Sequence, residues 1–296
     1  MAELSAGPFH LSLDPDHGAA IRRLDLIRDN CSVPILATGD GGPDAGQSAL
    51  FPMAPFANRA RDNRLTVADR EVQLAPNTPD PLCLHGWAWQ RPWVVTQQTD
   101  ASCRMALPLR DHGLRLDLTY DIALDCTGLA MTLSARNAGD TATLTGLGLH
   151  PYFPHRPDTQ LQFSAGHVWR EGPDHLPTRR EPVQRAKSWV KPRPLPHVWH
   201  NQCYSDWTGH ALIRQPSDGV DIHMAATGAT ALMLYTDPGL DRFALEPQSH
   251  VSGELHPGKD GLSLLAPGAH MAVTLRLTVA PIGTTPSIEE TAHART

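Results

Sequence analysis

Two side chains that can carry a proton stand where short apolar stretches end. His150 follows the run TGLGL and precedes a Pro-Tyr-Phe-Pro corner, and Glu246 follows RFAL and precedes a proline. A carboxyl group that is half buried in such a position has a raised pKa, which makes it a better general base near neutral pH. A plainer interpretation of each residue is open: a packed core histidine, and an edge carboxylate paired with Arg59 or Arg242.

Two earlier segments carry side chains that bind hydroxyl groups. The segment FPMAPFANRARDNRL contains Asn58 and Arg59, and the segment LCLHGWAWQRPW contains His85. Amide, guanidinium and imidazole groups form hydrogen bonds with the oxygen atoms of polar ligands. The alternative for Arg59 is a solvated basic face, and the alternative for His85 is packing among the tryptophans of its own segment.

These residues need elements to position them, and strand patterns dominate the chain. Apolar and polar residues alternate over 114–124 and 129–137, with the turn signal DCTG between them, and again over 270–280. The stretches ALMLYTD and RFALEPQ are further candidate strands. Many short strands joined by turns that contain Gly or Pro predict an all-β sandwich or barrel.

No composition shift and no internal repeat divides the 296 residues. We therefore predict one domain over residues 1–296, with a polar C-terminal tail that frays. Residues 170–199 are rich in Pro, Arg and Trp and are expected to form a long surface excursion.

The composition excludes several classes of protein. A net charge of −6 lacks the basic excess that nucleic-acid binding needs. No apolar run approaches the roughly 18 residues of a membrane span, and the N-terminus has no signal-peptide pattern, so we expect a cytoplasmic protein. Five widely spaced cysteines without a CxxC pattern predict free thiols rather than a disulfide framework.

Sixteen histidines invite a metal-site hypothesis, but their spacing does not support one. The sequence has no HxH and no HExxH pattern, so we predict no metal and no cofactor. The stretch GLSLLAPGAH is faintly similar to the second histidine motif of the cupins, whose paired upstream histidines are missing here. His270 is interpreted as a turn residue before the last strand, and a cupin-type metal enzyme stays the least favoured alternative.

Taken together, four segments resemble the aldose 1-epimerase (galactose mutarotase) family in the order in which that family has them. The family's Asn-Arg pair matches Asn58–Arg59, and the histidine of its Leu-His-Gly segment matches His85. The histidine of its His-x-Tyr-Phe segment matches His150, and its Glu-x-Gln segment matches Glu246 and Gln248. The resemblance spans roughly residues 8 to 280. It implies a large antiparallel β-sandwich of the supersandwich type with few short helices. It also implies a sugar substrate, no cofactor, and a monomer or homodimer.

The resemblance also assigns roles. Glu246 would be the base that takes the proton of the C1 hydroxyl, and His150 the acid that protonates the ring oxygen, with His150 protonated and Glu246 ionised in the resting enzyme. Arg59 and His85 would bind and orient the sugar, with Asn58 beside them. Gln248 would hold Glu246 or a hydroxyl. His155 is left as a surface bystander.

Two positions depart from the family pattern. Asn201 stands where the family commonly has an aspartate that holds sugar hydroxyls, and Asp206 is a nearby carboxylate that could substitute for it. Trp87 replaces the second glycine of a frequent His-Gly-Gly and is expected to offer a stacking surface for a sugar face.

Two other functions stay open at this point. A hexose-6-phosphate epimerase of the same fold would need extra basic residues near the site, and Arg61, Arg64 and Arg91 are available. A carbohydrate-binding protein without catalytic activity would also have this fold, although His150 and Glu246 argue for proton transfer.

Overall fold

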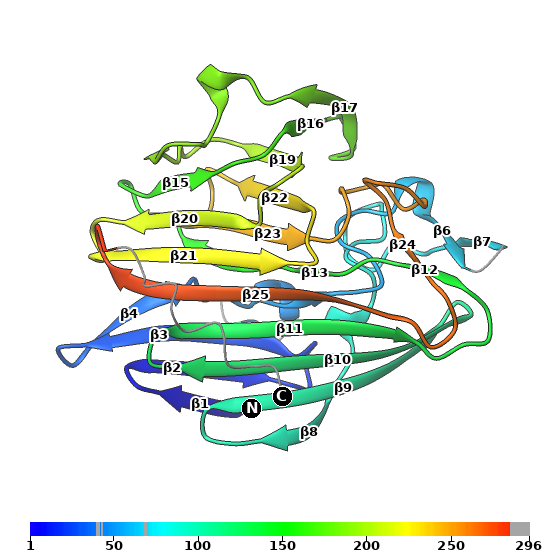
Figure 1. The fold of residues 1–296 in the computed structure, drawn as a ribbon, viewed down its shortest axis with the longest axis horizontal. Coiled ribbons are helices and arrows are strands. Elements are labelled where there is room, and N and C mark those ends of the chain that lie inside the picture. Colours follow the sequence, from blue (N-terminus) through cyan, green and yellow to red (C-terminus); the bar gives the residue numbers. More distant parts are fainter. Residues whose placement is uncertain (40–41, 43, 68–69, 285–296) are drawn as a thin grey trace.

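Two large antiparallel sheets dominate the computed structural model, which describes all residues except 40, 41, 43, 68, 69 and 285–296 (Figure 1). The predicted all-β sandwich is therefore confirmed. In spatial order, the nine-stranded sheet consists of β18 (Arg193–Pro194), β15 (Gln160–Phe163), β20 (His210–Gln215), β21 (Val220–Thr227), β25 (His270–Pro281), β11 (Gly128–Asn137), β10 (Leu114–Asp125), β9 (Ser102–Asp111) and β8 (Val94–Gln98).

The alternation that predicted these strands also explains which side chains face inward. In β10 every second residue from Leu114 to Leu124 is buried, and the residues between them are partly or fully exposed. β11 follows after a turn in which Asp125 Oδ1 accepts a hydrogen bond from the backbone N–H of Thr127. One apolar face turned inward and one polar face turned outward is the usual pattern of an antiparallel sheet with one solvated side.

The second sheet carries the candidate chemistry. Its eight strands are, in order, β17 (Pro177–Pro182), β16 (His167–Glu171), β19 (His200–Ser205), β22 (Ala231–Thr236), β23 (Arg242–Gln248), β13 (Gly148–Leu149) and β5 (Pro52–Met53), with β14 (Tyr152–Pro154) also paired to β23. In β23, Phe243 and Leu245 belong to the main apolar core. Because side chains alternate across a strand, Glu246 lies on the opposite face.

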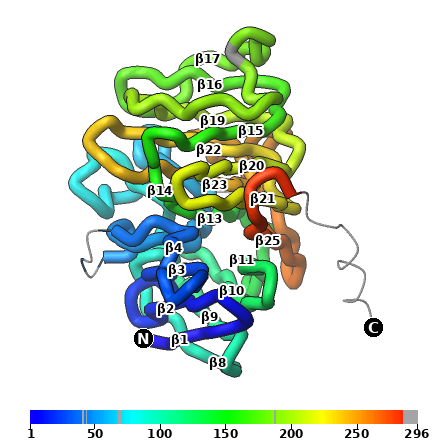
Figure 2. Tube along the Cα trace, turned by 90° about the vertical axis from the view of Figure 1, so that its left-hand side faces the viewer, coloured from blue at the N-terminus to red at the C-terminus, as the bar shows by residue number. Residues whose placement is uncertain are grey.

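The smaller elements surround these sheets. A four-stranded N-terminal sheet contains β1 (Ala2–Ala6), β2 (Phe9–Asp14), β3 (Ala20–Arg28) and β4 (Cys31–Leu36). Figure 2 shows it below the eight-stranded sheet, and the backbone N–H of Ala37 donates to Tyr152 O just after β4. Two further two-stranded sheets pair β6 (Arg64–Val67) with β7 (Arg70–Gln73) and β12 (Thr143–Thr145) with β24 (Ser263–Leu265).

Helical structure is limited to short turns in the described residues. The four 3-10 helices are η1 (Ala45–Gln47), η2 (Arg61–Asn63), η3 (Ala88–Gln90) and η4 (Arg185–Lys187). Within the part of the chain that the structure covers, no helix is long and apolar enough to cross a membrane. All five cysteines are free thiols, as predicted.

Two sequence predictions about surface segments need correction. Residues 170–199 are not an irregular excursion, because the segment completes β16 and supplies β17, η4 and β18, which extend both sheets at one end. His155 is not a surface bystander, since only 3% of it is exposed. Its ring stacks on His197 at 3.6 Å, and its Nε2 lies 3.1 Å from the carbonyl oxygen of Leu195. The C-terminal tail beyond residue 284 lies outside the described residues.

Candidate active site

His150 and Glu246 meet on one face of the eight-stranded sheet. The distance from His150 Nε2 to Glu246 Oε1 is 3.2 Å, and the two side chains are 7% and 3% exposed. β13 ends at Leu149 and delivers the imidazole, whose ring lies between Phe51 at 4.5 Å and Tyr152 at 4.7 Å. The side chain of Glu246 is therefore more deeply buried than the sequence predicted, which was half burial. The two candidate proton carriers are in direct contact.

The carboxylate of Glu246 is held by its second oxygen as well. Gln248 Nε2 donates to Glu246 Oε2 at 2.9 Å, and Ser252 Oγ donates to Gln248 Oε1 at 3.3 Å. Gln248 is two residues after Glu246 in β23, so both side chains lie on the same face. This arrangement fixes the carboxyl plane while Oε1 stays directed at His150.

Burial favours the uncharged form of both members of the pair. It raises the pKa of Glu246 to about 8, although the hydrogen bond from Gln248 and the charge of Arg59 oppose the shift. It lowers the pKa of His150 to about 3. Both shifts favour a protonated Glu246 beside a neutral imidazole, because neither charged form is solvated in this position. The sequence-based expectation was an ion pair in the resting state, and it stays a prediction.

Asn58, Arg59 and His85 come together beside this pair. Asn58 and His85 have positive φ angles of 61° and 59°, and they bind each other through the backbone: His85 N–H donates to Asn58 O at 2.8 Å. The backbone N–H of Asn58 donates to His85 Nδ1 at 3.0 Å. Because Nδ1 accepts, the proton of the neutral ring is on Nε2. The ring of His85 lies edge-to-face with that of His150 at 5.0 Å.

The loop that carries His85 requires glycine next to it. Gly86 has a φ of 63°, and a Cβ atom there would lie 2.3 Å from the carbonyl oxygen of Ala54. The glycine of the Leu-His-Gly pattern is thus a steric requirement of this backbone turn. Burial, together with His150 and Arg59, lowers the pKa of His85 well below its usual value, so the ring is a neutral hydrogen-bond donor.

Arg59 is oriented by a carboxylate. Its Nε and its terminal NH2 group each lie 2.8 Å from Asp80 Oδ2, and its side chain is 16% exposed. The guanidinium group is therefore held in place and keeps part of its surface open. The described residues contain no group of three His, Cys, Asp or Glu side chains arranged to hold a metal ion.

Comparisons with known proteins agree with this geometry. The family model described as aldose 1-epimerase matches residues 15–278. The chain belongs to the aldose 1-epimerase family. It is 32% identical over 287 residues to the uncharacterized protein YphB of Escherichia coli, which covers 93% of this chain and 97% of that protein.

Solved structures give the same fold. A crystal structure of an aldose 1-epimerase candidate from Escherichia coli K12 has a TM-score of 0.86 and 31% identity, covering 95% of this chain and 98% of the other. A galactose mutarotase-like protein from Clostridium acetobutylicum has a TM-score of 0.82 at 17% identity, covering 95% of each chain. The predicted aldose 1-epimerase family and its galactose mutarotase-type fold are thus confirmed.

One carboxylate near this candidate site was missed by the sequence analysis. Asn201 Nδ2 donates to Glu171 Oε1 at 2.6 Å, and Glu171 also accepts hydrogen bonds from His175 and from Trp199 Nε1 at 2.8 Å. Burial opposes ionisation of Glu171, but these three hydrogen bonds outweigh it and hold its pKa below the usual value. Asn201 thus lacks a charge of its own but holds an ionised carboxylate from the neighbouring strand β16.

Glu171 and Asn201 lie in a small cleft on the same face of the sheet as Glu246. Strand pairing aligns Cys203 of β19 with Met233 of β22, and Met233 with Glu246 of β23. The cleft is lined by Trp169, Glu171, His175, Pro177, Asn201, Cys203, Met233 and Ser252. Two strand spacings, roughly 10 Å, separate β19 from β23. The cleft and the proton-carrying pair therefore lie close together on the same face of the sheet.

Two expectations about other residues are not met. Asp206 is taken up by ion pairs with Lys259, His167 and Arg180, and it is not among the residues that line the cleft. Trp87 offers no free stacking surface, because it is 7% exposed and its ring stacks on His112 at 5.0 Å.

Trp199, rather than Trp87, is the exposed aromatic residue at this cleft. It is 46% exposed, and its indole N–H is fixed on Glu171. Its ring meets the edge of Tyr235 at 5.5 Å. The sequence analysis did not select Trp199, because the residue lies in the segment 170–199 that was interpreted as a surface excursion. Its position just before a strand was the available signal.

Proposed function

We propose that this protein is an aldose 1-epimerase that interconverts the α and β anomers of a free, uncharged aldose. The observation that carries the proposal is the contact between His150 and Glu246, on the sheet face that also carries the hydroxyl-binding candidates Glu171 and Asn201. Ring opening of a hemiacetal needs a base for the proton of the C1 hydroxyl and an acid that protonates the ring oxygen. These two residues supply both.

The positions of the protons on Glu246 and His150 at each step fit this reaction. Transfer of the shared proton from Glu246 to His150 across 3.2 Å gives a carboxylate and an imidazolium. Glu246 then takes the proton of the C1 hydroxyl while His150 protonates the ring oxygen, and the C1–O5 bond breaks to give the open-chain aldehyde. After rotation about C1–C2, the two transfers run in reverse on the other face of the carbonyl.

The state after ring opening is the one that burial favours. Once Glu246 has accepted a proton and His150 has donated one, the pair is again a protonated carboxyl group and a neutral imidazole. The raised pKa of Glu246 and the lowered pKa of His150 both favour this form. The pair therefore has the same favoured protonation state before and after ring opening, and the ion-paired form occurs only during the proton transfers.

The surrounding residues bind and orient the sugar. His85 donates through Nε2–H, and Arg59 donates from a guanidinium group that Asp80 fixes. At the far end of the cleft, Glu171 and the amide oxygen of Asn201 accept hydrogen bonds from sugar hydroxyls. Asn58 holds the backbone of this loop, and Gln248 orients Glu246.

A hexose-6-phosphate is a poorer fit than a free sugar. The arginines that would bind a phosphate are paired with carboxylates: Arg61 with Glu254 at 3.8 Å, Arg64 with Glu71 at 3.3 Å and Arg91 with Asp111 at 2.8 Å. The cleft itself presents the ionised Glu171, which repels a phosphate. The family resemblance allows either substrate, and these charges favour the uncharged one.

Polarimetry on freshly dissolved α-D-glucose and α-D-galactose, with glucose 6-phosphate compared by saturation-transfer NMR, tests the proposal. Accelerated anomer exchange of a free sugar supports it. Faster exchange of the phosphate ester than of every free sugar would favour the phosphate alternative. Sugar binding without any acceleration would point to a carbohydrate-binding protein.

A further inference from the structure

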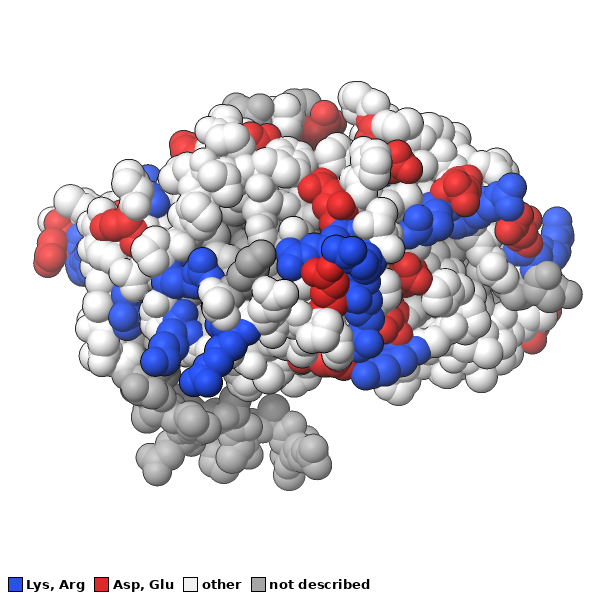
Figure 3. All heavy atoms as spheres, turned by 90° about the horizontal axis from the view of Figure 1, so that it is seen from above, with Lys and Arg blue, Asp and Glu red and all other residues white. Residues whose placement is uncertain are grey.

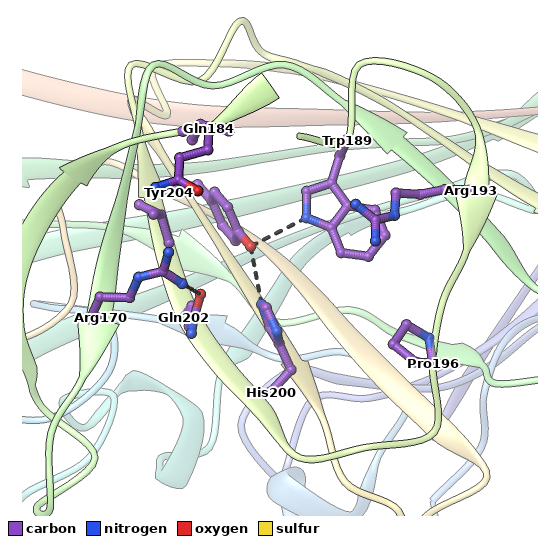
Figure 4. A pocket seen from close by; sticks show the side chains of 10 residues that line it. Arg170, Gln184, Trp189, Arg193, Pro196, His200, Gln202 and Tyr204 are labelled. Atoms are coloured by element: carbon purple, nitrogen blue, oxygen red, sulfur yellow. Dashed lines mark hydrogen bonds between the residues drawn. The ribbon is translucent and has the colours of Figure 1, made fainter. Parts of the chain in front are cut away.

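A second cavity, of about 250 Å³, lies on the other face of the two strands that carry the sugar cleft. In β16, Glu171 faces the cleft and Arg170 faces the cavity; in β19, Asn201 faces the cleft and Gln202 the cavity. This follows from the alternation of side chains along a strand. The opposite wall comes from the segment between β17 and β19, which supplies Trp189, Arg193 and Pro196 (Figure 4). The cavity therefore lies at the end of the molecule where β17 and β18 form the edges of the two sheets.

The wall of the cavity presents fixed polar groups. Tyr204 OH accepts a hydrogen bond from Trp189 Nε1 at 3.2 Å and lies 3.1 Å from His200 Nε2 (Figure 4). Arg170 NH1 donates to Gln202 Oε1 at 3.1 Å. These hydrogen bonds hold the side chains in one arrangement while their remaining donors and acceptors stay available to a ligand.

Positive charge gathers around this cavity although the protein as a whole is acidic. Residues 170–193 contain seven Lys and Arg but three Asp and Glu, in a chain of net charge −6. Seen from this end of the molecule, Lys and Arg side chains form several groups (Figure 3). A local excess of one sign raises the concentration of small ligands of the opposite sign.

The two arginines of the wall differ in their partners. Arg170 is paired with Glu181, whose Oε2 lies 2.8 Å from Arg170 Nε. Arg193 lies over the ring of Trp189 at 4.7 Å and, among the described residues, forms no ion pair. The guanidinium group of Arg193 is therefore the cation of this wall whose charge is not balanced by a neighbouring carboxylate.

We propose that this cavity binds a small anionic ring compound, a monosaccharide that carries a phosphate or a carboxylate group. Its volume is slightly below the usual range of about 300–1,000 Å³ for small-molecule sites, which limits the ligand to one ring. Arg193 receives the anionic group, and Gln202, His200 and Tyr204 receive the hydroxyls. The charge preference is opposite to that of the sugar cleft, where Glu171 repels anions.

Isothermal titration calorimetry tests this site with glucose 6-phosphate, glucuronate, glucose and inorganic phosphate as probes. We expect at least one of the two anionic sugars to bind the wild-type protein, and to bind R193Q about ten- to a hundredfold more weakly, as for loss of a charged hydrogen bond. K191Q removes an exposed charge of the same segment that does not line the cavity, and it is expected to bind as the wild type does.

Two further variants separate this site from the active site and from loss of folding. E246Q is expected to bind the anionic probes normally, and R193K to retain binding within a few fold, because the charge remains. Preference for glucose 6-phosphate or for glucuronate identifies which anion the site takes. The proposal is overturned if neither anionic sugar binds at millimolar concentration, if inorganic phosphate binds as tightly as the sugars, or if E246Q rather than R193Q abolishes binding.

Discussion

Replacing Glu246 with Gln is expected to change activity and stability in opposite directions. The amide is close in size to the carboxyl group and can accept a hydrogen bond, but it cannot take a proton from a C1 hydroxyl. Loss of one positioned proton transfer lowers a rate by about 10²- to 10⁴-fold. The same substitution removes a group whose ionisation is unfavourable in the folded protein, so E246Q should be more stable than the wild type near neutral pH.

The size of the stability gain follows from the pKa of the buried carboxyl group. Burial raises this pKa from 4.5 to about 8. A carboxyl group with a raised folded-state pKa contributes fully to stability below pH 4.5, and this contribution is lost as the pH rises toward 8. Each pH unit in that window is worth about 1.4 kcal/mol, so at pH 7 the wild type has lost on the order of 3 kcal/mol.

Urea unfolding of both proteins at pH 5 and at pH 7.5, with polarimetry on the same samples, measures the two effects. The free energies of unfolding should be close at pH 5, and E246Q should be the more stable protein at pH 7.5. His150 is present in both proteins, so its own titration largely cancels in the difference. A stability difference that stays constant between the two pH values would refute the buried, protonated carboxyl group. Near-normal polarimetric rates in E246Q would refute its role as the base.

The other predictions concern the same cleft. His150→Gln should lower kcat by about 10²- to 10⁴-fold in the same polarimetric assay, with a folded near-UV spectrum as the control. In the wild type, kcat should decline above about pH 8, where the pair loses its shared proton as Glu246 ionises, and a profile flat to pH 10 would contradict this. Glu171→Gln should raise KM about ten- to a hundredfold with kcat within a few fold, whereas Asp206→Asn should leave both unchanged. Exhaustive EDTA treatment should leave the rate unchanged, because the proposed reaction needs only two proton carriers and no metal ion. Loss of activity with EDTA, followed by recovery on adding a divalent metal, would contradict this prediction.

The strands could be predicted because their signal is local. Alternation over 114–124 and 129–137 is a property of consecutive residues, and the structure has β10 and β11 there. The candidate proton carriers His150 and Glu246 could also be selected from the sequence, since motif order and apolar context single them out. Their contact at 3.2 Å could not be predicted, because it depends on β13 pairing beside β23, which no local pattern encodes.

Glu171 was missed for the same reason. It ends β16, in a stretch whose Pro and Arg content indicated a loop, and only the pairing of β16 with β19 brings it to Asn201. The alternation in the stretch HVWRE was the available signal. The errors on His155 and Trp87 are related, since a sequence shows that a ring can stack but not which face of the sheet it occupies.

The electrostatics of the pair bear on the class of substrate. His150 and Glu246 are both buried, and an isolated charge at either position would be strongly unfavourable. In the proposed cycle one proton always belongs to the pair, so the pair keeps the same net charge with the ring sugar and with the open-chain aldehyde. An uncharged sugar therefore enters, opens and leaves without requiring a net charge in the buried site. A phosphate group would have to be accommodated beside Glu171, whose own charge three hydrogen bonds maintain. The unfavourable burial of unpaired charge thus underlies both the favoured protonation state of the pair and the proposed preference for a neutral aldose.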